Sequence, residues 1–204
     1  MRKTDGLGNS TKCVHIGGGV DTAYGSVATP IYQTTTYELP SMAELIDINV
    51  NGKKGYQYSS GANPTQESAA RKIAALEGGE EALVFSGGMA AITSTIATYV
   101  KRGDEILAQN DLYSASHRFL NTLSDKYGIK SRFFNTLDVG SAEKLVNENT
   151  KLMYIETPTN PALRLLDIAQ AVEIAQRHNI VSVLDNTFAS PMNQRPLDLG
   201  IDIV

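Results

Sequence analysis

Asp185 is the residue whose type and place in the sequence point most clearly to chemistry. It follows the apolar run 180–184, which reads as a buried strand, so its carboxylate stands at the carboxyl end of that strand. Ligands of open α/β sheets bind outside this end. A carboxylate there can form an ion pair with the protonated ring nitrogen of a cofactor. It can equally cap the turn or helix that follows the strand.

The run Ser86-Gly87-Gly88-Met89 opens a predicted helix and offers a place for a phosphate. Glycines let a ligand approach the backbone, the first N–H groups of the helix attract an anion, and the Ser86 hydroxyl adds a donor. The alternative is a plain glycine turn between strand and helix. A hydrolase nucleophile elbow does not fit, because that motif needs glycine where Val84 stands.

Two further residues could complete a cofactor pocket. Tyr113 follows the strand predicted to end near Ala108, and its ring could stack on a flat cofactor or simply pack as an ordinary tyrosine. Asn160 lies between Pro158 and Pro161, which stiffen the loop and would aim its amide, although a rigid turn without a ligand is the alternative. Together with the carboxylate and the phosphate site, these residues predict a pyridoxal-phosphate pocket.

Such a pocket also needs a lysine that holds the cofactor as a Schiff base. The nearest candidate in the sequence, Lys151, opens a predicted strand and so falls at the opposite end of the sheet. A further strand begins at Ile201 and breaks off at Val204, which would leave sheet hydrogen bonds unmade. We therefore expect Val204 to be a truncation or a processing point, and we expect the 204 residues alone not to complete the reaction.

The elements that must position these residues alternate between strand and helix. Asn63-Pro64 is a typical helix start, with Asn as the cap and Pro at the first helical position. Helices are predicted over 64–77, 89–100, 114–126, 141–147 and 166–178. Strands are predicted over 82–85, 104–108, 129–134, 152–155 and 180–184. This order favours an α/β fold with a mainly parallel, doubly wound sheet.

The residues before Asn63 have a different character. They lack strong periodicity, are rich in Gly, Thr, Tyr and Pro, and contain one short helix-like stretch near 41–48. We interpret 1–62 as an extended N-terminal arm and 63–204 as the cofactor-binding large domain. A long irregular segment needs something to organise it, and a partner subunit is a common solution.

Composition narrows the classes of function. The net charge is −4 and no basic face stands out, so we expect no nucleic-acid partner. No apolar run approaches the length of a membrane helix, and no signal peptide opens the chain, so we expect a cytoplasmic protein without a membrane contact. The single cysteine, Cys13, fits a reducing compartment. The three histidines show no metal-binding spacing, and no metal site is predicted.

Several motifs, in this order, closely resemble one family. They are Tyr58-Ser59-Ser60-Gly61-Ala62-Asn63-Pro64-Thr65, Ala75-Leu76-Glu77-Gly78-Gly79-Glu80, Phe85-Ser86-Gly87-Gly88-Met89-Ala90-Ala91, Tyr154-Ile155-Glu156-Thr157-Pro158-Thr159-Asn160-Pro161 and Val183-Leu184-Asp185-Asn186-Thr187-Phe188. The family is that of the pyridoxal-phosphate-dependent enzymes of cysteine and methionine metabolism. It includes cystathionine γ-lyase, cystathionine γ-synthase, methionine γ-lyase and O-acetylhomoserine sulfhydrylase, and the resemblance covers essentially the whole chain.

The resemblance implies an aspartate-aminotransferase-like large domain, and homodimers or homotetramers whose active sites are shared between subunits. It implies a sulfur-containing amino acid or an O-acyl-homoserine as substrate, with elimination or γ-replacement as the reaction. The N-terminal arm would reach the neighbouring subunit, where Tyr58 would contact the phosphate of the cofactor. The Schiff-base lysine of the family would follow just beyond Val204, and the small domain that binds the substrate carboxylate would also lie outside this chain.

The resemblance also assigns roles to individual residues around the cofactor. Gly88 and Met89 would donate main-chain N–H groups to the phosphate, with Ser86 nearby.

On the ring side, the same resemblance makes Tyr113 the stacking residue and Asp185 the partner of the ring nitrogen. Asn160 would reach the phenolic oxygen, and Thr187 would line the other side of the ring.

Two positions depart from the family pattern. The motif is usually Tyr-x-Arg, with an arginine that holds the neighbour's phosphate, and here that position is Ser60. Lys53 or Lys54 could supply the missing charge, or could be ordinary surface lysines. Methionine γ-lyases tend to carry a cysteine where Ala115 stands, which favours the cystathionine enzymes or a sulfhydrylase.

Two other classes of function compete with an enzyme. One is a non-catalytic truncated pseudoenzyme or subunit fragment, which the serine at position 60 and the early end of the chain favour. The other is a nucleotide domain on the same kind of sheet, which would require a Gly-x-Gly-x-x-Gly fingerprint at the first helix.

Overall fold

The computed structural model describes residues 6–18 and 24–204, so residues 1–5 and 19–23 of the predicted arm lie outside the described part. The chain forms two compact units, residues 1–84 and residues 85–204. The second unit contains the sheet and all but one of the predicted cofactor-binding residues. The exception is Tyr58, which belongs to the first unit.

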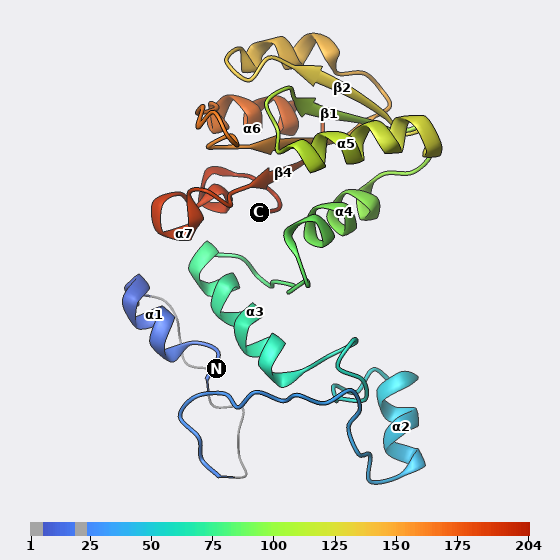
Figure 1. Ribbon diagram of the computed structural model, residues 1–204, viewed down its shortest axis with the longest axis vertical. Coiled ribbons are helices and arrows are strands. Elements are labelled where there is room, and N and C mark those ends of the chain that lie inside the picture. Colours follow the sequence, from blue (N-terminus) through green and yellow to red (C-terminus); the bar gives the residue numbers. More distant parts are fainter. Residues whose placement is uncertain (1–5, 19–23) are drawn as a thin grey trace. The chain divides into compact units, whose positions relative to one another are not determined.

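A four-stranded parallel sheet forms the centre of the second unit (Figure 1). The strand order is β2-β1-β3-β4, and every neighbouring pair is parallel. The strands are β1 Glu105–Gln109, β2 Lys130–Phe134, β3 Thr150–Glu156 and β4 Val181–Asp185. These bounds agree within about two residues with the strands predicted over 104–108, 129–134, 152–155 and 180–184. The predicted start of a further strand near the C-terminus is limited to one parallel bridge between Ile203 and Val183.

Helices cover both faces of this sheet, as expected for a doubly wound fold. The helical elements of the unit are α4 Gly88–Tyr99, α5 Ser114–Thr122, α6 Ile168–Arg177 and the short α7 Ser190–Asn193. A π-helical turn at Leu123–Tyr127 continues α5, and separate 3-10 turns lie between β2 and β3 at Val139–Leu145 and after α7 at Pro196–Leu199. The predicted helix over 114–126 is therefore regular α-helix only as far as Thr122, and the helix predicted over 141–147 is a 3-10 turn over 139–145 rather than an α-helix.

Strand residues alternate between two hydrophobic clusters. Leu107 and Met153 pack with α6 and the 3-10 turn at 139–145, whereas Ile106, Leu152 and Tyr154 pack with α4 and α5. This alternation follows from the period of two in a strand. The central strands β1 and β3 are thus buried almost throughout, whereas the edge strand β2 exposes Lys130 and Arg132. On the central strands, mainly the ends are free to present polar groups.

The connections leave the sheet in different directions at β1 and β3. From β1 the chain passes through α5, on one face, to β2; from β3 it passes through α6, on the other face, to β4. β1 and β3 are neighbours in the sheet. Because the loops that follow them diverge, this is a topological switch point, where open α/β sheets bind their ligands.

The first unit contains helices α1 Asn9–His15, α2 Met42–Asn49 and α3 Pro64–Glu77. Asn63 caps α3 as predicted: its side-chain oxygen accepts from the Thr65 N–H at 2.8 Å. The Asn63 amide also donates to the Tyr32 carbonyl at 2.9 Å, which ties the irregular segment before residue 62 to the start of α3. Gly78, with φ at +81°, ends the helix in a left-handed conformation.

One prediction for the region before α4 is wrong, and one helix in this region was not predicted. Residues 82–85 do not form a strand: none of the described residues provides them with a ladder partner, and the Leu83 side chain is exposed. A short apolar run becomes a strand only where a neighbouring strand can accept its hydrogen bonds. Helix α1 was not predicted, because it is short and buries none of its residues.

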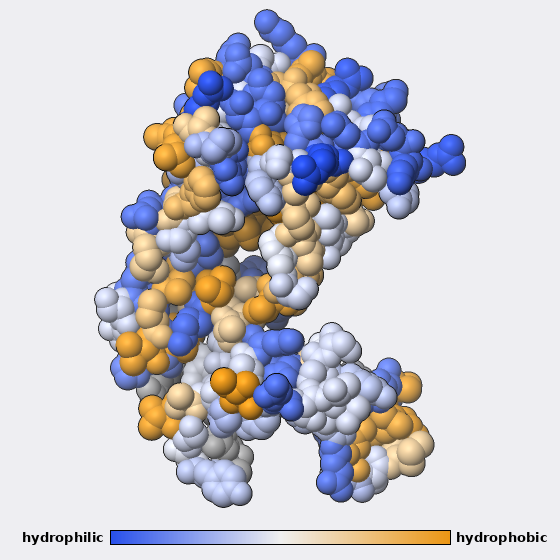
Figure 2. Space-filling view, viewed as in Figure 1, coloured by the Kyte–Doolittle hydropathy of each residue, from blue (hydrophilic) through white to orange (hydrophobic). Residues whose placement is uncertain are grey.

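Hydrophobic residues also lie on the surface of the first unit. In Figure 2 they gather over α2, where Met42 and Ile46 are exposed.

Within the described residues, no helix is long and apolar enough to cross a membrane. Nor do the described His, Cys, Asp and Glu residues form a group of three or more that could hold a metal ion.

Candidate active site

Asp185 lies at the carboxyl end of β4, as predicted, and its two oxygens have different partners. Oδ1 accepts from the Thr187 main-chain N–H at 3.0 Å and from the Thr187 hydroxyl at 2.5 Å. Oδ2 accepts from the Tyr154 hydroxyl at 3.4 Å. Thr187 therefore holds one edge of the carboxylate, and the Asp185 side chain is only half-buried. The other oxygen has capacity for a further donor.

Tyr154 connects Asp185 to the start of α4 through the interior. Its hydroxyl lies 3.4 Å from the Ser116 Oγ, and Ser116 in turn donates to the Met89 sulfur at 3.8 Å. Burial raises the pKa of Tyr154, and the negative charge of Asp185 raises it further. The hydroxyl thus stays protonated and can donate to the carboxylate. Met89 and Asp185, which the sequence assigns to opposite ends of one cofactor, are brought together on this face of the sheet.

The start of α4 has the features of an anion site. Gly87 caps the helix, and the N–H groups of Gly88 and Met89 have no acceptor among the described residues. A Cβ atom built on Gly87 or Gly88 would meet no protein atom within 4 Å, and Gly87 has an extended φ of −172°. Neither backbone strain nor packing therefore requires glycine here. Close approach of a ligand to free N–H groups gives a reason for both glycines. Ser86 is exposed beside them.

Tyr113 and Asn160 meet at Glu156, the last residue of β3. The two oxygens of the Glu156 carboxylate accept from the Tyr113 N–H at 2.8 Å and from the Asn160 N–H at 2.6 Å. Glu156 also stands opposite Asp185 in the register of β3 and β4. The Tyr113 side chain is 42% exposed, so its ring is available for stacking. The structure thus gathers the four ring-side positions at one edge of the sheet.

Glu156 is buried, with 4% exposure. Among the described residues, the hydrogen-bond partners of its carboxylate are main-chain N–H groups, and none of them is a cation. Burial raises its pKa, the two N–H donors oppose that shift, and the charge of Asp185 adds to it.

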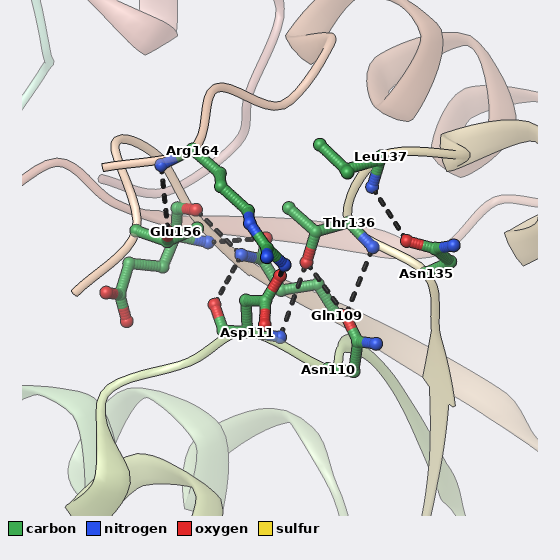
Figure 3. Close-up of polar contacts among 9 residues, drawn as sticks. Gln109, Asn110, Asp111, Asn135, Thr136, Leu137, Glu156 and Arg164 are labelled. Atoms are coloured by element: carbon green, nitrogen blue, oxygen red, sulfur yellow. Dashed lines mark hydrogen bonds and ion pairs between the residues drawn. The ribbon is translucent and has the colours of Figure 1, made fainter. Parts of the chain in front are cut away.

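Gln109 fixes the backbone of Glu156 from the neighbouring strand (Figure 3). Its amide nitrogen donates to the Glu156 carbonyl at 2.9 Å and to the Asp111 carbonyl at 2.7 Å, and its oxygen accepts from the Glu156 N–H at 3.0 Å. Farther out, Arg164 forms an ion pair with the Asp111 carboxylate at 2.7 Å. The loops after β1 and β3 are therefore joined by two layers of polar contacts.

Sequence reasoning did not single out Glu156, Gln109 or Tyr154. One signal was available for Glu156: a charged residue follows an apolar run that reads as a buried strand, as it does at Asp185. The bonds between Gln109 and the main chain of Glu156 could not be predicted from the sequence, because the two residues are 47 positions apart.

Three other positions can be placed. Tyr58 forms an antiparallel bridge with Thr36 inside the first unit, and its side chain is exposed. Lys53, one of the two lysines considered as a substitute for the family arginine, forms an ion pair with Glu44 at 2.6 Å in that unit. Lys151 donates to the Glu148 carbonyl at 2.7 Å near the amino end of β3, far along the sheet from Asp185.

Comparison with known proteins identifies the family. The family described as Cys/Met metabolism PLP-dependent enzyme matches residues 10–204. The chain belongs to this family. The cystathionine gamma-lyase of Bacillus subtilis is 38% identical over 195 residues, which are 95% of this chain and 49% of that protein. The L-methionine gamma-lyase of Treponema denticola is 38% identical over 205 residues, covering 100% of this chain and 51% of that protein.

The fold agrees with a solved structure of the same family. The cystathionine gamma-lyase of Lactobacillus plantarum, complexed with L-serine, has a TM-score of 0.86 and 34% identity, covering 97% of this chain and 49% of that one. The chain thus spans about half the length of the relatives it matches. The cofactor of the family is pyridoxal phosphate, and the free N–H groups at α4 and the carboxylate of Asp185 fit its phosphate and its ring nitrogen.

Proposed function

We propose that this chain forms the cofactor-binding part of an enzyme that makes or breaks carbon–sulfur bonds in sulfur amino acids. Its substrates would be cystathionine, homocysteine or an O-acyl-homoserine, and the reaction a β- or γ-elimination or a γ-replacement. The names of the family's members support this class of chemistry. The observation that carries the proposal is the edge of one sheet at which an anion site and a carboxylate for a ring nitrogen lie together.

The phosphate end of the cofactor would be held by α4. The N–H groups of Gly88 and Met89 would donate to the phosphate, and the Ser86 hydroxyl would add a contact. The free state of both N–H groups supports this assignment.

The ring end would be held by residues that follow β1, β3 and β4. Bound pyridoxal phosphate supplies a ring that withdraws electrons from the substrate. The Asp185 carboxylate would keep a proton on the ring nitrogen, because an opposite charge stabilises the protonated form. Tyr113 would stack on one face of the ring, Thr187 would line the other, and the Asn160 amide would bind the phenolic oxygen.

A partner subunit would complete the site as part of the same proposal. In a homodimer or homotetramer, Tyr58 would contact the phosphate bound by the neighbour. Ser60 occupies the position of the family arginine, and Lys53 is already paired with Glu44. We therefore expect phosphate binding to depend more on α4 here than in relatives with the arginine. We place the enzyme in the cytoplasm, where the single cysteine would remain reduced.

Reconstitution of the full-length protein tests this function. The apo protein and the protein loaded with pyridoxal phosphate are incubated with cystathionine, with methionine, and with O-acetylhomoserine plus sulfide. Keto acids and sulfur-containing products are then quantified. We expect turnover of at least one substrate, and only in the loaded protein. A loaded protein that turns over none of them would contradict the proposal.

A further inference from the structure

One buried carboxylate joins the two loops that diverge at the switch point of the sheet. Glu156 accepts one N–H from Tyr113, in the loop after β1, and one from Asn160, in the loop after β3. The distance from the carboxylate oxygen to the nitrogen is 2.8 Å for Tyr113 and 2.6 Å for Asn160, which is typical of strong, charge-assisted hydrogen bonds. Tyr113 is also the cap residue of α5, so the same contact fixes where that helix begins.

The position of Glu156 is costly for folding alone. A buried carboxylate is usually paired with a cation, and here both partners are neutral main-chain groups. The guanidinium of Arg164, the nearest cationic group in this network, is paired with Asp111 instead. The neighbouring charge that acts on Glu156 is Asp185, which repels it. A hydrophobic residue or a glutamine would avoid this cost, so the carboxylate calls for a reason beyond packing.

The way in which the two carboxylate oxygens join two loops supplies a reason for a carboxylate at this position. Its two oxygens hold two N–H groups a fixed, short distance apart, and each N–H belongs to a residue whose side chain the proposed function places on the cofactor ring. Gln109 holds the main chain of Glu156 on both sides, so the carboxylate itself cannot drift. The position of the Tyr113 ring relative to the Asn160 amide is thus set by one side chain.

We propose that Glu156 is a positioning residue of the cofactor site, which sets the spacing of Tyr113 and Asn160 by accepting both of their main-chain N–H groups. This inference rests on the proposed function. Glu156 does not touch the cofactor; it acts through the two loops. A glutamine in its place keeps the size but offers only one oxygen, so its NH₂ group must face one of the two N–H donors.

The test uses the full-length protein and two glutamate-to-glutamine variants. Glu156→Gln removes the double acceptor at the carboxyl edge. Glu105→Gln is the matched control, because Glu105 is equally buried, at 5% exposure, but bonds Arg132 and Asn147 at the amino edge. Three quantities are measured: amide hydrogen exchange resolved to Tyr113 and Asn160, the dissociation constant of pyridoxal phosphate, and the near-ultraviolet circular dichroism of the bound cofactor.

In Glu156→Gln we expect exchange of at least one of the two N–H groups to accelerate about 10- to 100-fold, and the dissociation constant to rise by a similar factor, because a hydrogen bond to a charged group is lost. The circular dichroism of the bound cofactor should change, since the stacking ring moves. In Glu105→Gln, all three should stay at their wild-type values. Unchanged exchange and unchanged cofactor affinity in Glu156→Gln would overturn the proposal, and so would an equal loss in both variants.

The wild-type protein gives an independent result if Glu156→Gln does not fold. The Tyr113 and Asn160 N–H groups should exchange slowly in the apo protein, although both lie in loops. Fast exchange of both would overturn the proposal. Failure of the wild type to bind pyridoxal phosphate would contradict the proposed function instead, and the exchange result would still decide whether Glu156 holds the two loops.

Discussion

The two edges of the sheet use a buried glutamate in opposite ways. Glu105 begins β1 at the amino edge, where it accepts from the guanidinium of Arg132 on the neighbouring strand β2 and from the amide of Asn147 in the loop before β3. Glu156 ends β3 at the carboxyl edge, where its acceptors are filled by main-chain N–H groups alone. Glu105 thus forms an ion pair, whereas the carboxylate of Glu156 is hydrogen-bonded to neutral groups.

Their pKa values move in opposite directions for this reason. The hydrogen bond from Arg132 lowers the pKa of Glu105 against the effect of burial, whereas burial prevails at Glu156 and raises its pKa. Strained electrostatics of this kind gather at functional sites, while a paired carboxylate is typical of a structural contact. The two edges thus differ as a structural contact and a ligand site would, as the proposed function requires.

The largest difference between the edges should come from their aspartates. Asp185→Ala in the full-length enzyme should lower turnover by about 10² to 10³ or more, because the ring nitrogen loses its charged partner. Asp104→Ala is the control at the amino edge, where the Asp104 carboxylate accepts the Lys101 N–H at 2.9 Å. It should cost about 1 kcal/mol of unfolding free energy and leave turnover unchanged. Steady-state kinetics measures turnover, and urea unfolding measures the free energy of unfolding. Equal turnover in the two variants would contradict the difference between the two edges.

The glutamates should differ in how stability depends on pH. The pKa of Glu105 is lower in the folded state, so its contribution is present above the unfolded pKa, about 4.3, and is lost as the pH falls through the folded value. The pKa of Glu156 is raised, so its contribution is present at low pH and is lost as the pH rises through the folded value.

Urea unfolding of the two glutamine variants between pH 3 and pH 7 measures this contrast. Relative to wild type, Glu105→Gln should lose more stability at pH 7 than at pH 3. Glu156→Gln should lose less at pH 7 than at pH 3. Parallel curves for both variants would show that the two carboxylates share one role.

The smallest effect should come from Tyr154. Tyr154→Phe removes a hydroxyl 3.4 Å from Asp185 while keeping the buried ring. Loss of one neutral donor should lower turnover about 2- to 10-fold with the fold intact. Tyr127→Phe, in the exposed turn before β2, is the control and should have no effect. A drop of a hundredfold in Tyr154→Phe would mean that its hydroxyl carries a role this account does not give it.

Much of the sheet could be predicted because β1, β3 and β4 are mainly apolar runs whose residues are mostly buried, whereas the edge strand β2 is partly exposed. Asp185 was placed correctly at the end of β4 by that pattern alone, and the cap at Asn63 followed from local residue types. The segment 82–85 is similarly apolar but forms no strand. A strand needs a neighbouring strand to pair with, and the sequence of the segment itself does not specify one. Regular helix was overestimated after Thr122, where the chain continues as a π-helical turn to Tyr127.

The polar network of the site was beyond the sequence for a different reason. Glu156 and Gln109 act on main-chain groups outside their own loops, and any residue except proline can supply a main-chain N–H. Residue types therefore give no sign of such a contact. The family resemblance identified the residues that would touch the cofactor, but not the ones that hold those residues in place.

The central claim is that the carboxyl edge, together with the start of α4, binds pyridoxal phosphate. Hydrogen exchange of the full-length apo protein with and without pyridoxal phosphate tests this most directly. The account predicts new protection in the segments 86–91, 111–116, 157–163 and 185–188. It predicts no change at the amino edge, in 101–106, 128–132 and 147–151. Protection confined to the amino edge, or no protection in 86–91, would contradict it.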